Sequence, residues 1–263
     1  MTADLAARYE LGRTLIRRAG ELAAGYAARL ADLPVRSKGV QDVVTEADVA
    51  VELLIKQAVA DAFPGDAFLG EETGPSAVTG ADHIWVVDPI DGTQPFVSGL
   101  TSWCISIALV AAGELQFGMV YNPPLDELFE GGRGRPALLN GRPIAPHPGR
   151  DLTEGIVTVG YSPRVGPDQI VPVFDRLLRR GGMFFRNGSG ALTLCYVSCG
   201  RMLGYVEPHV NSWDALGGIA VLQAAGGRTN DFLDGDGLLA GNRIVAGPPA
   251  VYEALDEVLG PPR

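Results

Sequence analysis

Hydrophobic residues in the first part of the chain recur at helical spacing. Apolar positions three and four residues apart predict a long amphipathic helix over residues 3–31. Polar residues dominate the stretch 35–44, where we expect a loop. Thr45 followed by Asp48 is typical of a capping box, and the apolar positions beyond it predict a second helix. The chain is therefore expected to begin with two helices.

The next apolar runs are short and are separated by turn residues, a pattern that predicts strands. A Gly, Pro and Ser-rich loop is expected over 74–82, and Asn140-Gly141 marks a tight turn. The expected strands cover residues 67–70, 84–87, 103–110, 115–121, 128–129 and 137–139. This part of the chain should form a largely antiparallel sheet.

Beyond the Pro- and Gly-containing stretch 145–154, short apolar runs alternate with longer helical patterns, which indicates an α/β arrangement. The expected strands are 156–160, 183–186, 203–207 and 244–246, and the expected helices are 167–180, 189–199, 212–225 and 249–259. We expect one compact unit with two halves, an α+β half over residues 1–150 and an α/β half over residues 151–263.

The charge balance is acidic, with 31 Asp and Glu against 21 Lys and Arg. This balance argues against nucleic acid or an anionic membrane as a partner, because both need a basic surface. No apolar leader and no apolar run of membrane-span length is visible, so we expect a cytoplasmic protein. The cysteines, Cys104, Cys195 and Cys199, lie in apolar segments and are expected to be buried free thiols.

Asp88 and Asp91 follow the apolar strand residues 84–87 directly. Two carboxylates three residues apart at the exit of a buried strand are unfavourable without a cation, and oxygen-rich clusters suit Mg²⁺. Gly92 and Thr93 are expected to begin a helix, whose free backbone N–H groups favour an anion. The stretch therefore predicts a metal site beside a phosphate site.

Other acidic residues have two interpretations each. The pair Glu71-Glu72 ends a strand and is either a ligand pair or a solvated loop. Asp214 falls in the first turn of a helix capped by Ser212, where it either binds a metal or complements the helix dipole. Asp48 is either a catalytic group or only the acid of its capping box.

Several common catalytic motifs are absent from the sequence. Its three histidines form no H-x-x-x-H pair, there is no G-x-S-x-G motif, and the only lysines, Lys38 and Lys56, lie in no P-loop. Acidic residues and backbone groups must therefore carry the chemistry.

Five blocks of the sequence together resemble the inositol monophosphatase family of Mg²⁺-dependent, lithium-sensitive phosphatases. The blocks are Lys38 with Asp42-Val43-Val44-Thr45-Glu46-Ala47-Asp48, Gly70-Glu71-Glu72, Trp85-Val86-Val87-Asp88-Pro89-Ile90-Asp91-Gly92-Thr93, Gly188-Ser189-Gly190-Ala191, and Glu207 with Trp213-Asp214. The resemblance covers most of the chain, and its D-P-I-D-G-T and W-D blocks are highly specific. It implies a sugar-phosphatase-like layered sandwich, α-β-α-β-α, with a mixed, largely antiparallel first sheet, and a homodimer.

The resemblance also implies a role for each matching residue, with two or three Mg²⁺ ions as the cofactor. The metal ligands would be Glu71, Asp88, the Ile90 carbonyl, Asp91 and Asp214. Asp48 and Thr93, with Glu71, would activate a water, and the backbone of Gly92 and Thr93 would hold the phosphate. Substrate contacts would come from Gly188, Ser189, Gly190, Glu207 and His209, with Lys38 and Glu72 in support. An alternative interpretation of His209 is that it only fills a loop.

The implied reaction is hydrolysis of inositol 1-phosphate or a similar polyol phosphate by in-line attack of a metal-activated water. Histidinol-phosphate phosphatases share the scaffold but typically place an acid near Gly190, and none occurs between Arg186 and Leu194. Bisphosphate nucleotidases usually follow D-P-L-D-G-T with Lys-Glu, where this chain has Gln94-Pro95. Some bacterial relatives act instead as binding partners in transcription and ribosome assembly, which would require a basic or apolar exposed patch.

Overall fold

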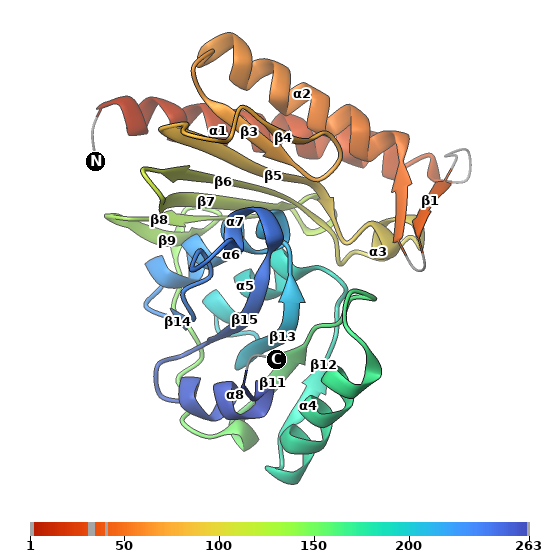
Figure 1. Ribbon diagram of the computed structural model, residues 1–263, viewed down its shortest axis with the longest axis vertical. Coiled ribbons are helices and arrows are strands. Elements are labelled where there is room, and N and C mark those ends of the chain that lie inside the picture. The colour runs from red at the N-terminus through yellow and green to blue at the C-terminus, as the bar shows by residue number, and fades with distance from the viewer. Residues whose placement is uncertain (1–2, 31–34, 40–41, 262–263) are drawn as a thin grey trace.

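The helices and strands stack in five layers, as the resemblance implied (Figure 1). The computed structural model describes residues 3–30, 35–39 and 42–261, with only the backbone over 35–39 and 42–44. The N-terminal elements are α1 (Ala3–Ala27), β1 (Val35–Gly39), β2 (Asp42–Thr45) and α2 (Glu46–Ala62). None of the helices in this described part of the chain has the length and hydropathy that a membrane span requires.

The first sheet has eight strands in the order β10-β9-β8-β7-β6-β5-β3-β4. Its strands are β3 (Ala67–Gly70), β4 (Gly74–Ser76), β5 (His83–Asp91), β6 (Cys104–Ala111), β7 (Glu114–Asn122), β8 (Glu127–Gly132), β9 (Arg135–Leu139) and β10 (Arg142–Pro143), with the short helix α3 (Thr93–Val97) between β5 and β6. Within this sheet, β3 and β5 pair in parallel, and the other neighbouring strands pair antiparallel. Helices α1 and α2 cover one face, where Ile16 and Ile55 pack against Trp85 and Phe117.

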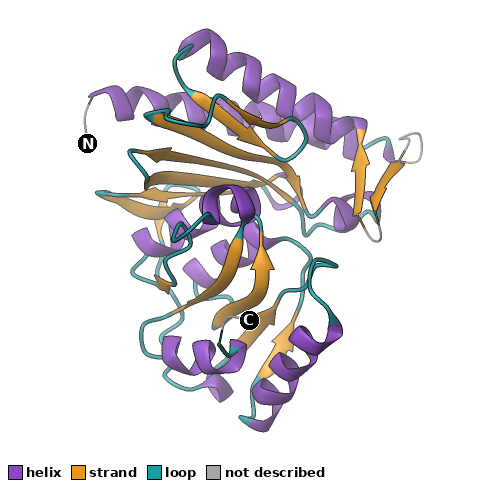
Figure 2. Cartoon of the chain, viewed as in Figure 1, coloured by secondary structure: helices purple, strands orange, loops and turns teal. Residues whose placement is uncertain are grey.

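The second sheet has the order β12-β11-β13-β15-β14. Its region comprises β11 (Ile156–Val159), α4 (Pro167–Arg179), β12 (Met183–Phe185), α5 (Gly190–Ser198), β13 (Gly204–Val210), α6 (Ser212–Ala224), β14 (Arg228–Thr229), α7 (Gly237–Ala240), β15 (Asn242–Gly247) and α8 (Tyr252–Leu259). Alternate residues of β13 face opposite sides, so that Val206 packs against α4 and α8 while Tyr205 packs against α5 and α6. Strand β12 forms an outer edge of this sheet (Figure 2).

Helices α5 and α6 form the middle layer between the two sheets. The backbone of α6 lies directly on β7, because a Cβ on Gly118 would overlap the backbone of Gly217. The Ser106 hydroxyl also donates to the Trp213 carbonyl at 3.1 Å. This close approach places the first turn of α6 beside the end of β5.

Three sequence predictions were wrong in detail. The expected loop 35–44 contains the β1–β2 hairpin, in which Val35 pairs with Thr45; the predictions for the Lys38 and Asp42 side chains lie outside the described part of the chain. The expected loop 74–82 begins with β4, an edge strand whose outer position tolerates Pro75. In both places backbone pairing with a neighbouring strand outweighs the weak local pattern.

The third difference concerns the length of elements. The first helix ends at Ala27 rather than residue 31, and the strand predicted over 84–87 continues to Asp91 through an irregularity after Asp88. Strand β14 and helix α7 were not predicted. The two sheets divide between Pro143 and Ile156.

Candidate functional site

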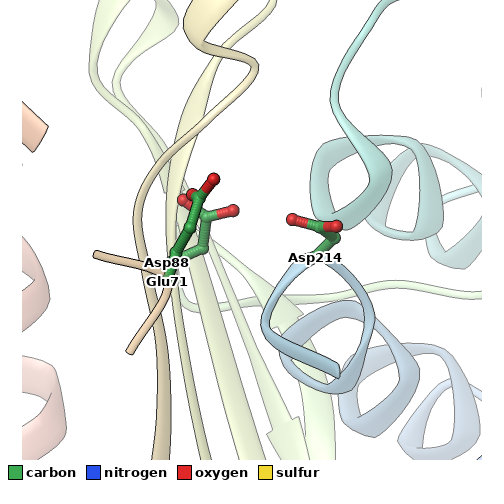
Figure 3. A group of neighbouring side chains, drawn as sticks. All are labelled: Glu71, Asp88 and Asp214. Atoms are coloured by element: carbon green, nitrogen blue, oxygen red, sulfur yellow. The ribbon is translucent and has the colours of Figure 1, made fainter. Parts of the chain in front are cut away.

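Three carboxylates meet where the first sheet faces α6. Oxygen atoms of Glu71, Asp88 and Asp214 all lie within 4.8 Å of one another. Gly70 and Val87 are paired in the parallel β3–β5 ladder, so the next residues, Glu71 and Asp88, emerge side by side. Figure 3 shows these two carboxylates together, with the Asp214 carboxylate pointing toward them from α6. The fold thus joins acids that are far apart in the sequence.

Asp214 reaches this position through the start of its helix. The sequence predicted Ser212 as the cap of this helix, but the cap is Asn211. The Asn211 N–H and its side-chain amide donate to Asp214 Oδ2 at 3.3 and 3.2 Å. The Ser212 hydroxyl instead donates to the Leu238 carbonyl at 2.6 Å. These contacts orient Asp214 without occupying both of its oxygens.

The cluster is electrostatically unfavourable by itself. Burial raises the pKa of Asp88 well above its usual value, and the charges of Glu71, Asp91 and Asp214 raise it further. Burial also raises the pKa of Asp214. A hard divalent cation would remove this repulsion, and a donor set made only of oxygens fits such an ion.

Asp91 faces the N-terminus of α5 rather than the three-carboxylate cluster. Its Oδ2 accepts from the Ser189 hydroxyl at 2.6 Å and the Ala191 N–H at 2.7 Å, and its Oδ1 accepts from the Gly190 N–H at 3.2 Å. Burial, together with the charge of Asp214, raises the pKa of Asp91 to about 7, although these hydrogen bonds oppose the shift. Asp91 therefore connects the end of β5 to α5, and its role as a metal ligand stays a prediction.

Asp48 is the acid of its capping box and also contacts Thr93, while its catalytic role stays a prediction. Its Oδ2 accepts from the backbone and hydroxyl of Thr45 at 2.8 and 2.6 Å, which completes the capping box of α2. Its Oδ1 lies 3.3 Å from the Thr93 hydroxyl, which also lies 3.1 Å from the Ile90 carbonyl. The cap therefore holds Asp48 against Thr93.

Gly92 caps the helix α3 with a backbone that favours glycine. Its φ is +94°, and a Cβ there would lie 2.8 Å from the Ser102 carbonyl oxygen. The chain can therefore turn sharply from β5 into α3, and the first N–H groups of α3 lack partners within the helix, as at any helix start.

A cavity of about 720 Å³ extends from these groups. Glu71, Asp91, Thr93 and Asp214 line it. The predicted substrate-contact residues Gly188, Ser189, Gly190 and Glu207 also line it. His209 does not: its ring nitrogen Nε2 lies 2.9 Å from the Ala240 carbonyl, and the residue lines a separate cavity of about 270 Å³.

Tyr205 is a cavity residue that sequence reasoning missed. It lies two positions before Glu207 on β13, so both side chains share one face, and its hydroxyl donates to the Glu207 carboxylate. Burial raises the pKa of Glu207 to about 7, while this hydrogen bond lowers it. The even spacing of a tyrosine and a glutamate in one strand was the available signal.

Glu52 is a second residue that sequence reasoning missed. Its fully buried carboxylate on α2 accepts from the N–H groups of Glu72 and Thr73 at 2.9 and 2.7 Å. A Cβ on Gly70 would overlap this carboxylate. Glu52 thus holds the turn that carries Glu71. The available signal was a second acid, one turn after Asp48, among the apolar residues of α2 that face the core.

The chain matches a family model and curated proteins over nearly its whole length. The model of the inositol monophosphatase family matches residues 4–260. Nus factor SuhB of Pasteurella multocida is 35% identical over 246 residues, which cover 92% of each chain. Nus factor SuhB of Escherichia coli is 33% identical over 241 residues, which cover 91% of this chain and 90% of that protein.

Solved structures share the fold. The extragenic suppressor protein suhB of Bartonella henselae superposes with a TM-score of 0.89 at 30% identity, covering 96% of this chain and 98% of the other. An inositol monophosphatase from Anabaena superposes with a TM-score of 0.84 at 29% identity, covering 99% and 98%. With the layered fold and the clustered acids, these matches show that the chain belongs to the inositol monophosphatase family.

Proposed function

We propose that this chain is a Mg²⁺-dependent phosphomonoesterase that acts on inositol 1-phosphate or a similar polyol phosphate. The observation that carries the proposal is the convergence of Glu71, Asp88 and Asp214. Glu71 and Asp214 line a large cavity together with Thr93, the first residue of α3. Membership of a phosphatase family supports it independently.

The difficulty of the reaction explains why several acids are needed. A phosphate monoester at neutral pH is a dianion, and enzymes that hydrolyse one lower the barrier by roughly 20–28 kcal/mol. A single general base contributes only about 10²–10⁴-fold. Bound divalent ions supply Lewis-acid charge and a more acidic water. We assign two or three Mg²⁺ ions to Glu71, Asp88, the Ile90 carbonyl, Asp91 and Asp214.

The remaining chemistry falls to groups around α3. The Asp48 carboxylate accepts from the Thr93 hydroxyl, so a water beside Thr93 can pass its proton toward this pair. The first N–H groups of α3, at Gly92 and Thr93, bind the phosphate oxygens. Glu207, which also lines the cavity, accepts hydrogen bonds from substrate hydroxyls, and Gly188 and Gly190 form part of the cavity wall beside it.

A panel of phosphate esters tests this function. The purified protein would be incubated with Mg²⁺ and inositol 1-phosphate, histidinol phosphate, glycerol phosphate or an adenosine bisphosphate, and phosphate release measured. We expect release from polyol phosphates, its loss with EDTA, and inhibition by Li⁺. Preferential release from histidinol phosphate would select that alternative instead, and no release from any ester would overturn the proposal.

A role as a binding partner is the second candidate, because several curated relatives are Nus factors. The chain also has an exposed apolar surface of the kind that such a role requires. This apolar edge consists of Val171 and Leu178 on α4 with Met183, Phe184 and Phe185 on β12. Binding to purified Nus factors of the host, with an Asp88→Asn variant beside the wild type, would test it: equal binding supports a role that is independent of catalysis.

We further propose that the chain forms a homodimer through the apolar edge, so that a second copy and a Nus factor compete for this surface. Met183, Phe184 and Phe185 are 64%, 45% and 43% exposed on an unpaired edge strand, an arrangement that invites association unless it is covered. Light scattering should give the mass of a dimer for the wild type and of a monomer for Met183→Lys combined with Phe184→Glu. Leu239→Glu, at another exposed apolar residue, should stay dimeric. A monomeric wild type would contradict this proposal.

A further inference from the structure

We infer that Tyr205 is a positioning residue for substrate recognition. Its hydroxyl holds one oxygen of the Glu207 carboxylate, so that the other oxygen receives a hydroxyl of the substrate's alcohol portion. The inference rests on the proposed function, because it specifies how the same cavity selects polyol phosphates among phosphate esters. It gives a role to a buried polar group, the Tyr205 hydroxyl, that the proposed reaction does not use.

The two oxygens of the Glu207 carboxylate have different surroundings. Oε2 accepts from the Tyr205 hydroxyl, and a Cβ on Gly160 would overlap the same oxygen. Oε1 has no hydrogen-bond partner among the residues that the structure describes, and Glu207 lines the cavity. One oxygen is thus held by the protein, and the other is the one that a ligand in the cavity can reach.

Packing fixes the tyrosine from which this hydrogen bond comes. Tyr205 is 1% exposed, and it belongs to the apolar cluster that contains Leu194 of α5 and Leu216 of α6. A Cβ on Gly190 would lie 3.5 Å from the Tyr205 hydroxyl, which places that hydroxyl beside the first turn of α5. The ring therefore has little freedom to turn, and its hydroxyl is a fixed point for the Glu207 carboxylate.

Gly160 limits the position of the same carboxylate from the neighbouring strand. It follows β11, and its N–H donates to the Val206 carbonyl at 2.9 Å, so its backbone runs beside β13. Gly160 is buried, and the carboxylate of Glu207 occupies the space that a side chain at this position would fill. Contacts from two strands of the second sheet therefore set where Glu207 points.

The groups around Glu207 act in opposite directions on its ionisation. Burial raises its pKa to about 7, while the hydrogen bond from Tyr205 lowers it. Of the nearby charges, those of Asp214 and Asp91 raise this pKa and that of Arg186 lowers it. Burial and the charge of Glu207 raise the pKa of Tyr205 well above its usual value, so the hydroxyl keeps the proton that it donates. Tyr205 therefore favours the ionised carboxylate, which only accepts hydrogen bonds and matches a substrate hydroxyl.

A pair of esters built on the same ring tests this inference: inositol 1-phosphate, and cyclohexyl phosphate, which lacks the hydroxyls. The ratio of their kcat/KM values measures the recognition of hydroxyls, because a general loss of activity affects both esters. We expect Tyr205→Phe to lower this ratio by about three- to tenfold, mainly through KM for inositol 1-phosphate. Tyr121→Phe is the matched control: it removes a hydrogen bond from a tyrosine to a carboxylate, that of Asp126 at 2.9 Å, outside the cavity, and should leave the ratio unchanged.

A double-mutant cycle tests whether Tyr205 acts through Glu207. Glu207→Ala should lower the ratio by at least about tenfold, because it removes a charged acceptor. Adding Tyr205→Phe to that variant should lower the ratio no further, since no carboxylate is left to position. Gly160→Ala should also lower the ratio, because its Cβ displaces the carboxylate without changing its charge. Additive losses in the double variant, or an unchanged ratio in Tyr205→Phe, would overturn the inference.

The pH dependence of the ratio separates positioning from a merely structural role. In the wild type the ratio should fall as the pH drops through the pKa of Glu207, because protonation removes the charge that strengthens the hydrogen bond. In Tyr205→Phe this fall should begin at a higher pH, because the hydrogen bond that lowers the pKa of Glu207 is absent. The phosphates of the two esters titrate alike, so their ionisation cancels in the ratio. A fall at the same pH in both proteins would contradict the assigned role.

The outcomes separate this inference from the proposed function. Hydrolysis of both esters with a ratio near one in the wild type would overturn the inference and leave the phosphatase intact. If neither ester were hydrolysed, the proposed function would fall, and calorimetric titration with the same two esters would replace the kinetic ratio. Tighter binding of inositol 1-phosphate that is lost in Tyr205→Phe would then support the inference, and equal binding of both esters would overturn it.

Discussion

Asp88 shows how burial and charge act against each other at a single residue. It is 1% exposed, lies in a strand of apolar residues, and has acids as neighbours on both sides. A metal-free site therefore favours partial protonation, whereas bound cations favour the ionised carboxylates. Asp91 differs, because α5 supplies it with three hydrogen bonds. The two aspartates of one motif thus have different surroundings.

We predict that Asp88→Asn and Asp91→Asn each abolish phosphatase activity through loss of metal. The amide removes a negative charge from a site that needs several to hold divalent ions. Measurement of kcat across a Mg²⁺ titration, with calorimetric Mg²⁺ binding, checks this. Asp231→Asn, at an exposed aspartate, serves as the control. If either variant kept most of the wild-type kcat at ordinary Mg²⁺, its assignment as a ligand would be wrong.

Thr93 allows a separate test of the proposed proton path. Its hydroxyl contacts both Asp48 and the Ile90 carbonyl, so Thr93→Val should lower kcat by about 10²–10⁴-fold. Thr93→Ser keeps the hydroxyl and should retain most of kcat, which makes it the matched control. Mg²⁺ binding should persist in both variants. Equal kcat for the valine and serine variants would exclude a role for the hydroxyl.

At the scale of elements, α2 supports the site from the outside of the first sheet. Its first turn presents Asp48 to Thr93, and one turn later Glu52 holds the backbone after Glu71. One helix therefore positions both a proposed base and a proposed metal ligand. Movement of α2 would disturb both together.

We predict that Glu52→Ala raises the Mg²⁺ concentration needed for half-maximal activity by at least about tenfold, because outer-sphere contacts tune metal affinity. It should also lower the free energy of unfolding by roughly 1.5–3 kcal/mol, since the backbone N–H groups of Glu72 and Thr73 lose a charged acceptor. Glu52→Gln retains one acceptor oxygen and should recover part of both losses. Glu46→Ala, exposed on the same helix, is the control. An unchanged Mg²⁺ requirement in Glu52→Ala would show that Glu52 only stabilises the fold.

The helix α3 explains why the unusual Gln94-Pro95 pair is tolerated. Pro95 lies in the first turn, where an N–H has no partner within the helix, and it is buried. A Cβ on Gly188 would lie 2.8 Å from the Pro95 ring, and Gly188 has a φ of +90°. The proline and the glycine therefore fit each other, and together they join α3 to the segment before α5.

At the scale of the whole molecule, the buried acids couple stability to pH and to metal. Burial raises the pKa of both Asp91 and Glu207 to about 7 in the folded chain, from ordinary values of 3.8 and 4.5. At a pH between the ordinary and the raised pKa, each of these two carboxyl groups is protonated in the folded state and ionised in the unfolded state. The free energy of unfolding of the metal-free protein should therefore fall as the pH rises from about 4 to 7.

We predict that Mg²⁺ reverses this loss, because it binds the ionised carboxylates. In EDTA, Tm should be lower at about pH 7.5 than at about pH 5, whereas saturating Mg²⁺ should raise Tm by roughly 5–10 °C at the higher pH and by less at the lower. Differential scanning calorimetry measures this. In Asp88→Asn the Mg²⁺ effect should disappear, and an equal Mg²⁺ effect at both pH values in the wild type would contradict the linkage.

Local patterns predicted those features that depend on neighbouring residues. The capping box of Thr45 and Asp48 is present, and Asn140 and Gly141 both have positive φ in the predicted turn. The β1–β2 hairpin and the edge strand β4 escaped prediction because a strand needs a partner that local spacing does not reveal. Tyr205 and Glu52 escaped for a similar reason: each acts through a contact with a residue whose position depends on the fold.

By itself, the sequence determined the order of most helices and strands and the motifs typical of the family, because spacing, capping and turn chemistry are local. Only the tertiary structure decided which acids meet. The parallel pairing of β3 with β5 sets Glu71 beside Asp88, and the glycine contact between α6 and β7 brings Asp214 to them. The tertiary structure also turned Asp91 toward α5 and placed His209 outside the cavity. Such distances follow from how whole layers pack, and layer packing depends on the complete chain.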